Sequence, residues 1–299
     1  MLSEESLELI VQDHLAELEW QAGHGPDFAP GSGERDTWND IVLRGRLRNA
    51  VRNLNPDVPE EYLDQAIGEV ITPKSQSAIA ENRRIHQILV EGYRGIEYID
   101  HEGNVQNPTI YFLSSQPHKN DYLSLNQVTV ANLDGERRFD VVCYVNGMPL
   151  AFIELKKTGA NTSVEGAHNQ LQTYVKEFGM AFRFANIVIP SDDLSAKYGT
   201  PFTPWNHFAP WNVDEDGSPV DPNNMVVAGE PVTQLDLLLD GLFNVERFGQ
   251  LYSDFTAFDD TAEGLVMRIA KPHQYFAVTK AVGSTITAAR GDKRAGVIW

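Results

Sequence analysis

Apolar residues recur at helical spacing through the first third of the chain. Residues 3–20 place five apolar side chains on one stripe, so we expect a helix that packs on a core. This stripe consists of Leu7, Ile10, Val11, Leu15 and Leu18. Further helices are predicted over 39–53, 59–70 and 75–92, and Gly92 suits the end of the last one. The positions expected to be buried on that last helix are Ile79, Ile85, Leu89 and Val90.

The middle of the chain changes to short segments rich in β-branched and aromatic residues, separated by turn residues. Strands are predicted for GIEYID, TIYFL, NQVTVANL, RFDVVCYV and PLAFIELKK, between residues 95 and 157. A helix follows across 166–178, and ANIVIP (185–190) is typical of a buried strand. The order of helices, meander, helix and strand predicts an α/β domain built on a mixed β-sheet flanked by helices.

The last third of the chain is less regular. Residues 191–232 are rich in Pro, Asp, Asn and Trp and predict a segment made mostly of loops. Helical patterns return at QLDLLLDGLF (234–243) and around 244–252. FTAFDDTAEG (255–264) has the composition of a boundary, and we therefore expect one domain over 1–258 and the beginning of another over 259–299.

Composition excludes several classes of protein. The 299 residues are 42% hydrophobic and 22% charged, as in soluble globular proteins. Cys143 is the single cysteine, so no intramolecular disulfide can form, which fits a reducing cytoplasm. No apolar run approaches the roughly 18 residues that span a bilayer, and the acidic start is unlike a signal peptide. We expect a soluble, cytoplasmic protein with no membrane partner.

The net charge of −18 opposes binding to nucleic acid. The charge is unevenly spread, because RGRLRNAVR (44–52) carries four arginines and no acid. Three interpretations stay open at this point. The arginines form a local basic strip for DNA, or they form a solvated helix face. In the third interpretation, further domains or partner subunits supply most of the affinity for DNA.

Three ionisable residues interrupt two otherwise apolar strands in RFDVVCYVNGMPLAFIELKK (138–157). Asp140 lies near the start of the first strand, and Glu154 and Lys156 end the second. Asn146-Gly147 between the strands is a strong hairpin signal. A simple two-residue turn would place Asp140 opposite Ile153 and away from Glu154. We therefore predict a three-residue, bulged turn, or a longer loop of the same parity. The three-residue turn places Asp140 on the face of Glu154 and diagonal to it.

Two converging carboxylates offer the hard oxygen ligands that Mg²⁺ prefers. Asp140 and Glu154 are therefore the predicted metal ligands, and Lys156 would position the attacking water or stabilise the transition state. The alternative is an ion-paired hairpin end without catalytic function. Gln170 and Tyr174, four residues apart on the predicted helix, share one face and could hydrogen-bond a phosphate or the lysine. Glu81, in AENRRIHQILVEGY, is a further candidate acid, or a solvated residue at a helix start.

These motifs resemble the nuclease domain of type I restriction enzyme motor subunits, in the PD-(D/E)xK superfamily. The resemblance rests on RFDVVCYVNGMPLAFIELKK, on the Q-x-x-x-Y spacing of residues 170–174 and on ENRRIHQILVEGY. It implies that Asp140 and Glu154 bind Mg²⁺ and that Lys156, Gln170, Tyr174 and, less directly, Glu81 serve catalysis. Phe-Asp replaces the usual Pro-Asp in this sequence.

The C-terminal segment adds a second resemblance. KPHQYFAVTKAV (271–282) is similar to the segment before the first ATP-binding motif of the helicase-like motors, and Gln274 matches their adenine-reading glutamine. GDKRAGVIW (291–299) resembles the strand before a phosphate-binding loop, and G-x-x-x-x-G-K-[ST] itself is absent from the sequence. We therefore expect the start of a RecA-like helicase domain at 259–299, and ATP binding only in a full-length subunit. An amphipathic helix that packs its aromatics is the simpler alternative.

The resemblance implies a Mg²⁺-dependent endonuclease that cleaves double-stranded DNA after ATP-driven translocation, together with methylation and specificity subunits. Two alternatives remain. One is a catalytically silent nuclease fold that docks on DNA or on a partner subunit. The other is a sugar hydrolase with a carboxylate pair, which we disfavour because Lys156 should lower, not raise, the pKa of a neighbouring acid.

Overall fold

A five-stranded mixed sheet forms the centre of the computed structural model, which describes residues 3–133, 135–157, 163–192, 194–221 and 225–291. The strands are β1 (Gln21–His24), β4 (Tyr122–Asn132), β5 (Gly135–Val145), β6 (Met148–Leu155) and β7 (Ile187–Ser191), and they are arranged in this order. The two outer pairs, β1–β4 and β6–β7, are parallel, and the two inner pairs are antiparallel. The predicted α/β fold with a mixed sheet is confirmed.

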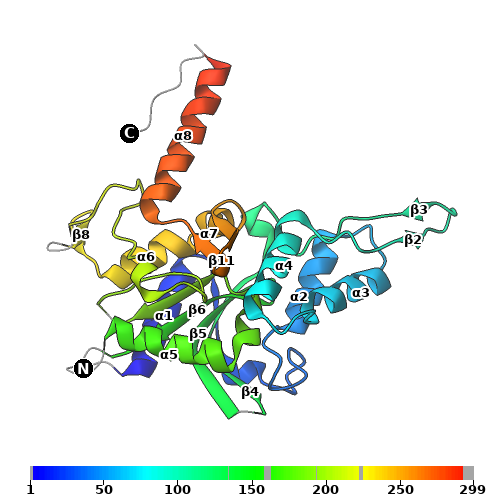
Figure 1. Cartoon of the computed structure of the whole chain (residues 1–299), viewed down its shortest axis with the longest axis horizontal. Coiled ribbons are helices and arrows are strands. Elements are labelled where there is room, and N and C mark those ends of the chain that lie inside the picture. Colours follow the sequence, from blue (N-terminus) through cyan, green and yellow to red (C-terminus); the bar gives the residue numbers. More distant parts are fainter. Residues whose placement is uncertain (1–2, 134, 158–162, 193, 222–224, 292–299) are drawn as a thin grey trace.

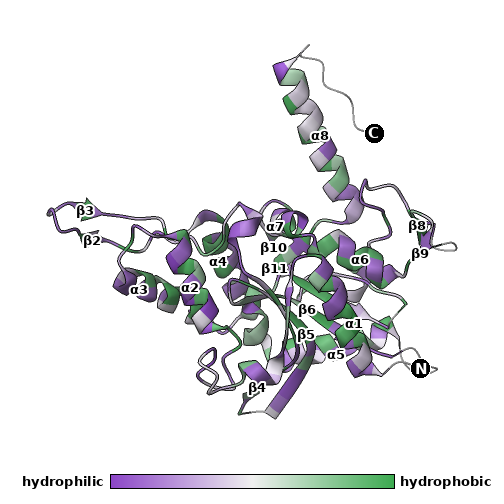
Figure 2. Ribbon diagram, turned by 180° about the vertical axis from the view of Figure 1, so that it is seen from behind, coloured by the Kyte–Doolittle hydropathy of each residue, from purple (hydrophilic) through white to green (hydrophobic). Residues whose placement is uncertain are grey.

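Helices cover both faces of this sheet (Figure 1). One face carries α1 (Glu4–Glu17), α2 (Arg44–Leu54), α3 (Glu60–Ile71), α4 (Ala78–Glu91), α6 (Gln234–Phe243) and α7 (Val245–Ser253). The other carries α5 (Val164–Glu177) and the short 3-10 helix η3 (Gly179–Phe184). Successive residues of β5 alternate between the two buried clusters, Val141 and Cys143 on one side, Val142 and Tyr144 on the other. Figure 2 shows that the central strands are predominantly hydrophobic.

The stripe predicted on α1 is partly wrong. Ile10 is 46% exposed, whereas Glu8 and Gln12 are buried beside Leu7 and Val11. Gln12 is buried because its Nε2 donates to the carbonyls of Gly23 and Ser124, at 2.8 and 3.1 Å, and so attaches α1 to the sheet. On α4, Val90 is likewise exposed rather than buried.

Other strand predictions also need correction. TIYFL (109–113) contributes an isolated bridge between Ile110 and Tyr93 rather than a strand. Residues 98–106 form a small hairpin of β2 (Tyr98–Ile99) and β3 (Val105–Gln106), which projects from the body (Figure 1). The Gly- and Pro-rich residues 23–33, whose composition predicts a loop, belong in part to β1 and to η1 (Gly25–Phe28). The segment 191–232 is mostly loop, as predicted, with η4 (Trp205–His207) and a hairpin of β8 (Val226–Val227) and β9 (Glu230–Pro231).

The C-terminal part described here consists of a hairpin and a long helix. β10 (Thr256–Thr261) and β11 (Gly264–Ile269) are antiparallel and are followed by α8 (Pro272–Arg290), which projects from the body (Figure 1). Arg83 on α4 pairs with Asp260, and the hydroxyl of Tyr198 donates to the Ala270 carbonyl. Residues 292–299, which include most of GDKRAGVIW, lie outside the described residues. The boundary near 258 and the RecA-like start therefore stay predictions.

Gln274 lies at the beginning of α8. Its Oε1 accepts a hydrogen bond from the backbone N–H of Lys271 at 2.8 Å, which caps the helix. Its adenine-reading role remains a prediction. No helix within the described ranges is both long and apolar enough to cross a membrane.

Candidate active site

The turn between β5 and β6 has two residues, so the predicted three-residue turn is wrong. Asn146 and Gly147 both have positive φ, 52° and 77°, as a type I′ turn requires. Val145 lies opposite Met148. The amide of the buried Asn146 donates to the Phe112 carbonyl at 2.8 Å, and a Cβ on Gly147 would lie 2.4 Å from the Leu43 carbonyl oxygen. Tertiary contacts thus fix the tight turn.

A bulge inside the hairpin restores the register that the turn alone would lose. Tyr144 pairs with Pro149 and Cys143 pairs with Ala151, so Leu150 is an extra residue on β6. Pro149 has no N–H to give to the ladder, which is consistent with a bulge at this point. Beyond the bulge Val141 pairs with Ile153, and the same register places Asp140 directly across from Glu154. The two acids are therefore opposite neighbours, not the diagonal pair we expected.

Asp140, Glu154 and Lys156 meet at the end of β6. The Nζ of Lys156 donates to Oε1 of Glu154 at 2.7 Å, and the backbone N–H of Leu155 donates to Oδ2 of Asp140 at 2.8 Å. The Glu154 side chain is 1% exposed and that of Lys156 is 17% exposed. Asp140 lies close enough to Glu154 for its charge to raise the pKa of that carboxyl. Two acids and one amine thus share a site in which Glu154 is buried and Asp140 and Lys156 are partly exposed.

The electrostatics of the site show a shortage of positive charge. Burial, and then the charge of Asp140, raise the pKa of Glu154 to about 8. Burial also raises the pKa of Asp140, against the hydrogen bond from Leu155. Burial alone would lower the pKa of Lys156, but the Glu154 carboxylate beside it reverses the direction and raises it. Lys156 does act to lower the pKa of Glu154, as expected, but burial and the charge of Asp140 outweigh it, so the net pKa of Glu154 is raised.

Helix α5 brings Gln170 and Tyr174 to the same region. The Gln170 amide hydrogen-bonds the Tyr174 hydroxyl one helical turn away. Burial, followed by the charge of Glu154, raises the pKa of Tyr174. The phenol therefore lies close enough to the acid pair to feel its charge, and Gln170 orients that phenol.

Glu81 is occupied elsewhere. Its buried carboxylate pairs with Arg84 at 2.7 Å, and the same guanidinium donates to the carbonyls of Val70 and Thr72. Burial works to raise the pKa of Glu81, but the hydrogen bonds from Arg84 and from the backbone lower it. These contacts attach the start of α4 to the end of α3. They show a structural use for Glu81 and no contact with the acid pair.

Glu8 is an acid that the sequence reasoning missed. It is 2% exposed on α1, and its carboxylate accepts from the Asn126 amide at 3.3 Å. Burial raises the pKa of Glu8, and the charge of Asp140 raises it further. One signal was available in the sequence. An acid adjoining the stripe of Leu7, Val11 and Leu15 is expensive to bury without a specific partner.

The chemistry of the acid pair suits a divalent cation. Asp140 and Glu154 present adjacent carboxylate oxygens, and the raised pKa of both shows that a second positive charge would be favoured there. Among the described residues, no group of three or more His, Cys, Asp or Glu side chains is close enough to hold a metal ion by itself. Any cation at this pair would therefore take its remaining ligands from water or substrate.

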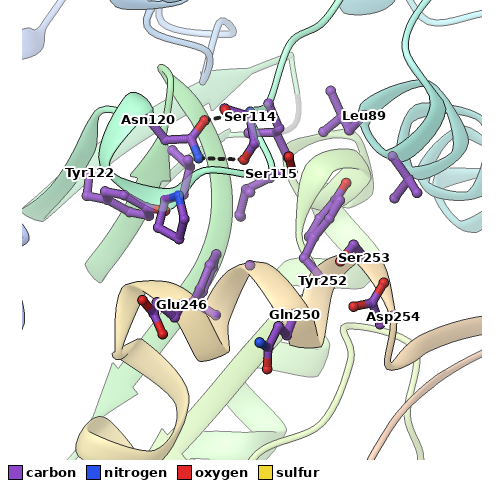
Figure 3. Close-up of a pocket in the computed structure, with 17 residues that line it drawn as sticks. Leu89, Ser114, Ser115, Asn120, Tyr122, Glu246, Gln250, Tyr252, Ser253 and Asp254 are labelled. Atoms are coloured by element: carbon purple, nitrogen blue, oxygen red, sulfur yellow. Dashed lines mark hydrogen bonds between the residues drawn. The ribbon is translucent and has the colours of Figure 1, made fainter. Parts of the chain in front are cut away.

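A cavity of about 610 Å³ lies at the other end of these strands (Figure 3). Its walls come from α4, α7 and residues 113–122, and Val145 and Leu150 reach it from β5 and β6. Glu154 is four residues beyond Leu150, roughly 13 Å along the strand. The cavity and the acid pair are therefore separate places in the fold.

The arginines of 44–52 do not form a free basic strip. All four pair with acids, Arg44 with Asp36 and Asp40, Arg46 with Asp121, Arg48 with Asp64, and Arg52 with Glu60. Most of these pairs are solvent-exposed. The structure thus supports the interpretation of this segment as a solvated helix face.

Comparison with known proteins identifies the family. The family described as "Type I restriction enzyme R protein N terminus" matches residues 1–207. Along its whole length the chain is 30% identical to the type I restriction enzyme HindI endonuclease subunit of Haemophilus influenzae, of which it covers 28%. It is 28% identical, over 95% of its length, to the putative type I restriction enzyme MjaIXP endonuclease subunit of Methanocaldococcus jannaschii, again covering 28%. The chain therefore spans less than a third of these relatives, and it belongs to the family of type I restriction enzyme R protein N termini.

Proposed function

We propose that this chain is the Mg²⁺-dependent endonuclease domain of a type I restriction–modification motor subunit and hydrolyses phosphodiesters of double-stranded DNA. The observation that carries the proposal is the buried cluster of Asp140, Glu154 and Lys156, in which two acids share one amine. Such a cluster destabilises the folded protein. Clusters of this kind are most common where a ligand or a substrate binds. Its place within a family of restriction-enzyme subunits makes DNA the substrate that fits best.

Each residue of the cluster has a distinct task. Asp140 and Glu154 would hold the Mg²⁺ ion, which when bound would activate water and neutralise charge on the phosphate. Lys156 donates hydrogen bonds to the attacked phosphate, where negative charge develops. Tyr174, oriented by Gln170, offers a hydroxyl on the α5 side of the acid pair. Glu8 replaces Glu81 as the helix acid of the site, because Glu81 is committed to Arg84.

The rest of the activity belongs to a longer protein and its partners. ATP-driven translocation by the full-length subunit would deliver DNA to this site, and methylation and specificity subunits would select the sequence. The chain itself has a net charge of −18, and its one arginine-rich helix is paired with acids. Since phosphate binding depends on cationic contacts, most of the affinity for DNA must come from those other parts.

The acid pair argues against a sugar hydrolase. Asp140 and Glu154 lie opposite each other on adjacent strands, and Lys156 is hydrogen-bonded to Glu154. Glycosidases that retain configuration separate their two carboxyl groups by about 5 Å, and those that invert it need more. Acids that are direct cross-strand neighbours do not match the wider separation of the inverting class, and the lysine bonded to Glu154 acts to lower the pKa that a general acid needs raised.

One alternative has a specific observation in its favour. The paired arginines and acidic surface suit a nuclease fold that binds a partner subunit but cleaves nothing. Metal binding separates the two functions. Calorimetric titration of this chain with Mn²⁺ should give a site that Asp140→Asn abolishes and Glu165→Gln, an exposed change on α5, leaves intact. A chain that binds no Mn²⁺ would favour the silent module.

Cleavage is tested in the complete enzyme. Asp140→Ala or Lys156→Ala in the full-length subunit, assembled with its partners, should remove DNA cleavage while DNA-stimulated ATP hydrolysis continues. Glu81→Gln should retain cleavage if the protein stays folded, because Glu81 serves the α3–α4 junction. Undiminished cleavage by the Asp140 and Lys156 variants would refute the proposal.

A further inference from the structure

Strand β4 is interrupted at the residue that faces Asp140. Asn126 pairs with Val141 and Val128 pairs with Phe139, and Gln127, between them, is outside the ladder. Gln127 has a φ of 53°, in the left-handed region that glycine favours. A non-glycine residue held there costs on the order of 1 kcal/mol, and such strain concentrates at functional sites. The side chains at this interruption are therefore candidates for a functional role.

The side chains at this interruption bind Glu8. The Asn126 amide donates to Oε2 of Glu8 at 3.3 Å, and the Gln127 side chain lies close enough to lower the pKa of the same carboxyl. Both contacts favour the ionised form of Glu8 and so act to lower its pKa. Burial and the charge of Asp140 act in the opposite direction. Without these two amides, a carboxylate only 2% exposed would have little reason to stay charged beside Asp140.

Asn126 is itself fixed from the other side. Its Oδ1 accepts a hydrogen bond from Nδ1 of His24 on β1, at 2.9 Å. Rotation of the amide would place its oxygen against Glu8 and its nitrogen against His24, so the two contacts define one orientation. Gly25, next in the chain, lets the backbone pass, because a Cβ there would lie 2.5 Å from the Asn126 carbonyl oxygen.

We propose that Asn126 and Gln127 are positioning residues that hold the charge of Glu8 next to the Asp140–Glu154 pair, outside the direct ligands of the cation, with His24 fixing the Asn126 amide. The inference rests on the proposed function, since it assumes that Asp140 and Glu154 bind a divalent cation. Glu8 adds negative charge to that site, and the two amides determine where the charge lies. Residues that orient a metal site in this way typically change metal affinity about 10- to 100-fold.

Calorimetric titration of this chain with Mn²⁺ tests the inference through a double-mutant cycle. Glu8→Gln should weaken Mn²⁺ binding about 10-fold, and Asn126→Leu should weaken it several-fold. In the Glu8→Gln background, Asn126→Leu should cause no further loss, because the amide acts only through Glu8. His24→Ala should give a smaller loss than Asn126→Leu. Asn53→Leu, at an exposed position on α2, is the matched control and should leave the affinity unchanged.

The outcomes separate this inference from the proposed function. Equal losses from Asn126→Leu with and without Glu8 would show that the amide does not act through the acid, and would overturn the inference. Unchanged affinity in Glu8→Gln, with binding abolished by Asp140→Asn, would also overturn it and leave the proposed function standing. Unchanged affinity in Asp140→Asn would defeat the proposed function itself. If circular dichroism shows that Asn126→Leu does not fold, Asn126→Ser, which is smaller and adds no charge, replaces it in the cycle.

Discussion

Replacing Glu154 by glutamine should stabilise the protein at pH 8 much more than at pH 5. The folded protein holds the carboxyl of Glu154 at a pKa of about 8, against 4.5 when the residue is free in the unfolded chain. At pH values between these two pKa values, Glu154 is protonated in the folded state and ionised in the unfolded state. The contribution of Glu154 is therefore favourable at low pH and is lost as the pH rises through 8.

The size of the effect follows from the same two pKa values. A shift of one pKa unit corresponds to about 1.4 kcal/mol. The difference from 4.5 to about 8 would then cost the wild-type protein about 3 kcal/mol between pH 5 and pH 8. Glutamine keeps an oxygen for the ammonium of Lys156 and carries no proton to lose, so the variant should escape this cost.

Urea unfolding at pH 5, 6.5 and 8 in metal-free buffer measures the difference. Glu165→Gln, an exposed change on α5, removes the same charge without the burial and is the control. Saturating Mg²⁺ at pH 8 should stabilise the wild type but not Glu154→Gln, since a cation that binds only the native state shifts the equilibrium toward it. A stability difference between variant and wild type that stays constant across the three pH values would refute the reasoning.

Three further predictions concern other parts of the fold. Hydrogen bonds that His14 donates to Asp236, and then to Asp240, raise the pKa of His14 to about 9. A stabilisation present below pH 6.5 should therefore be lost as the pH rises through 9, by about 1–2 kcal/mol after solvent screening of the half-exposed acids. Urea unfolding of His14→Gln should show no such loss. His168→Leu should raise the unfolding free energy by about 1 kcal/mol at pH 7, because both ring nitrogens are buried without a hydrogen-bond partner, and a less stable variant would contradict this. Gly147→Ala should cost about 2 kcal/mol or more in the same assay, because of its positive φ and the Leu43 carbonyl 2.4 Å from the added Cβ, whereas Gly249→Ala, which meets nothing within 4 Å, should be neutral or stabilising.

The hairpin that carries Asp140 and Glu154 illustrates what the sequence could establish. The strands on either side of Asn146-Gly147, and the polar residues inside them, were evident from alternation and turn chemistry. The register was not, because it depends on Leu150, one extra apolar residue in a run of apolar residues. The pattern of apolar and polar residues does not reveal a bulge of this kind. Pro149, which cannot donate to the ladder, was the one residue that indicated it.

Glu8 and Glu81 show a different limit. Both are acids near the start of an amphipathic helix, and both are buried. Helical spacing cannot tell which acid has a neighbouring arginine to pair with and which faces another acid, since that depends on the packing of helices onto the sheet. Arg84, three residues after Glu81, was the available clue that Glu81 would be neutralised locally.

Three features that cost stability lie near the acid pair. Glu154 is buried with a raised pKa, Glu8 lies against Asp140, and Gln127 has a left-handed backbone. At the other end of the same strands Asn146 is buried too, yet it donates to the Phe112 carbonyl and accepts from the backbone N–H of Asp121. The fold can therefore satisfy buried polar groups fully when nothing else is required of them. The acids lack enough positive charge around them, whereas the polar groups of the turn have all their partners. This contrast supports the proposal that a cation from outside the chain binds the acids.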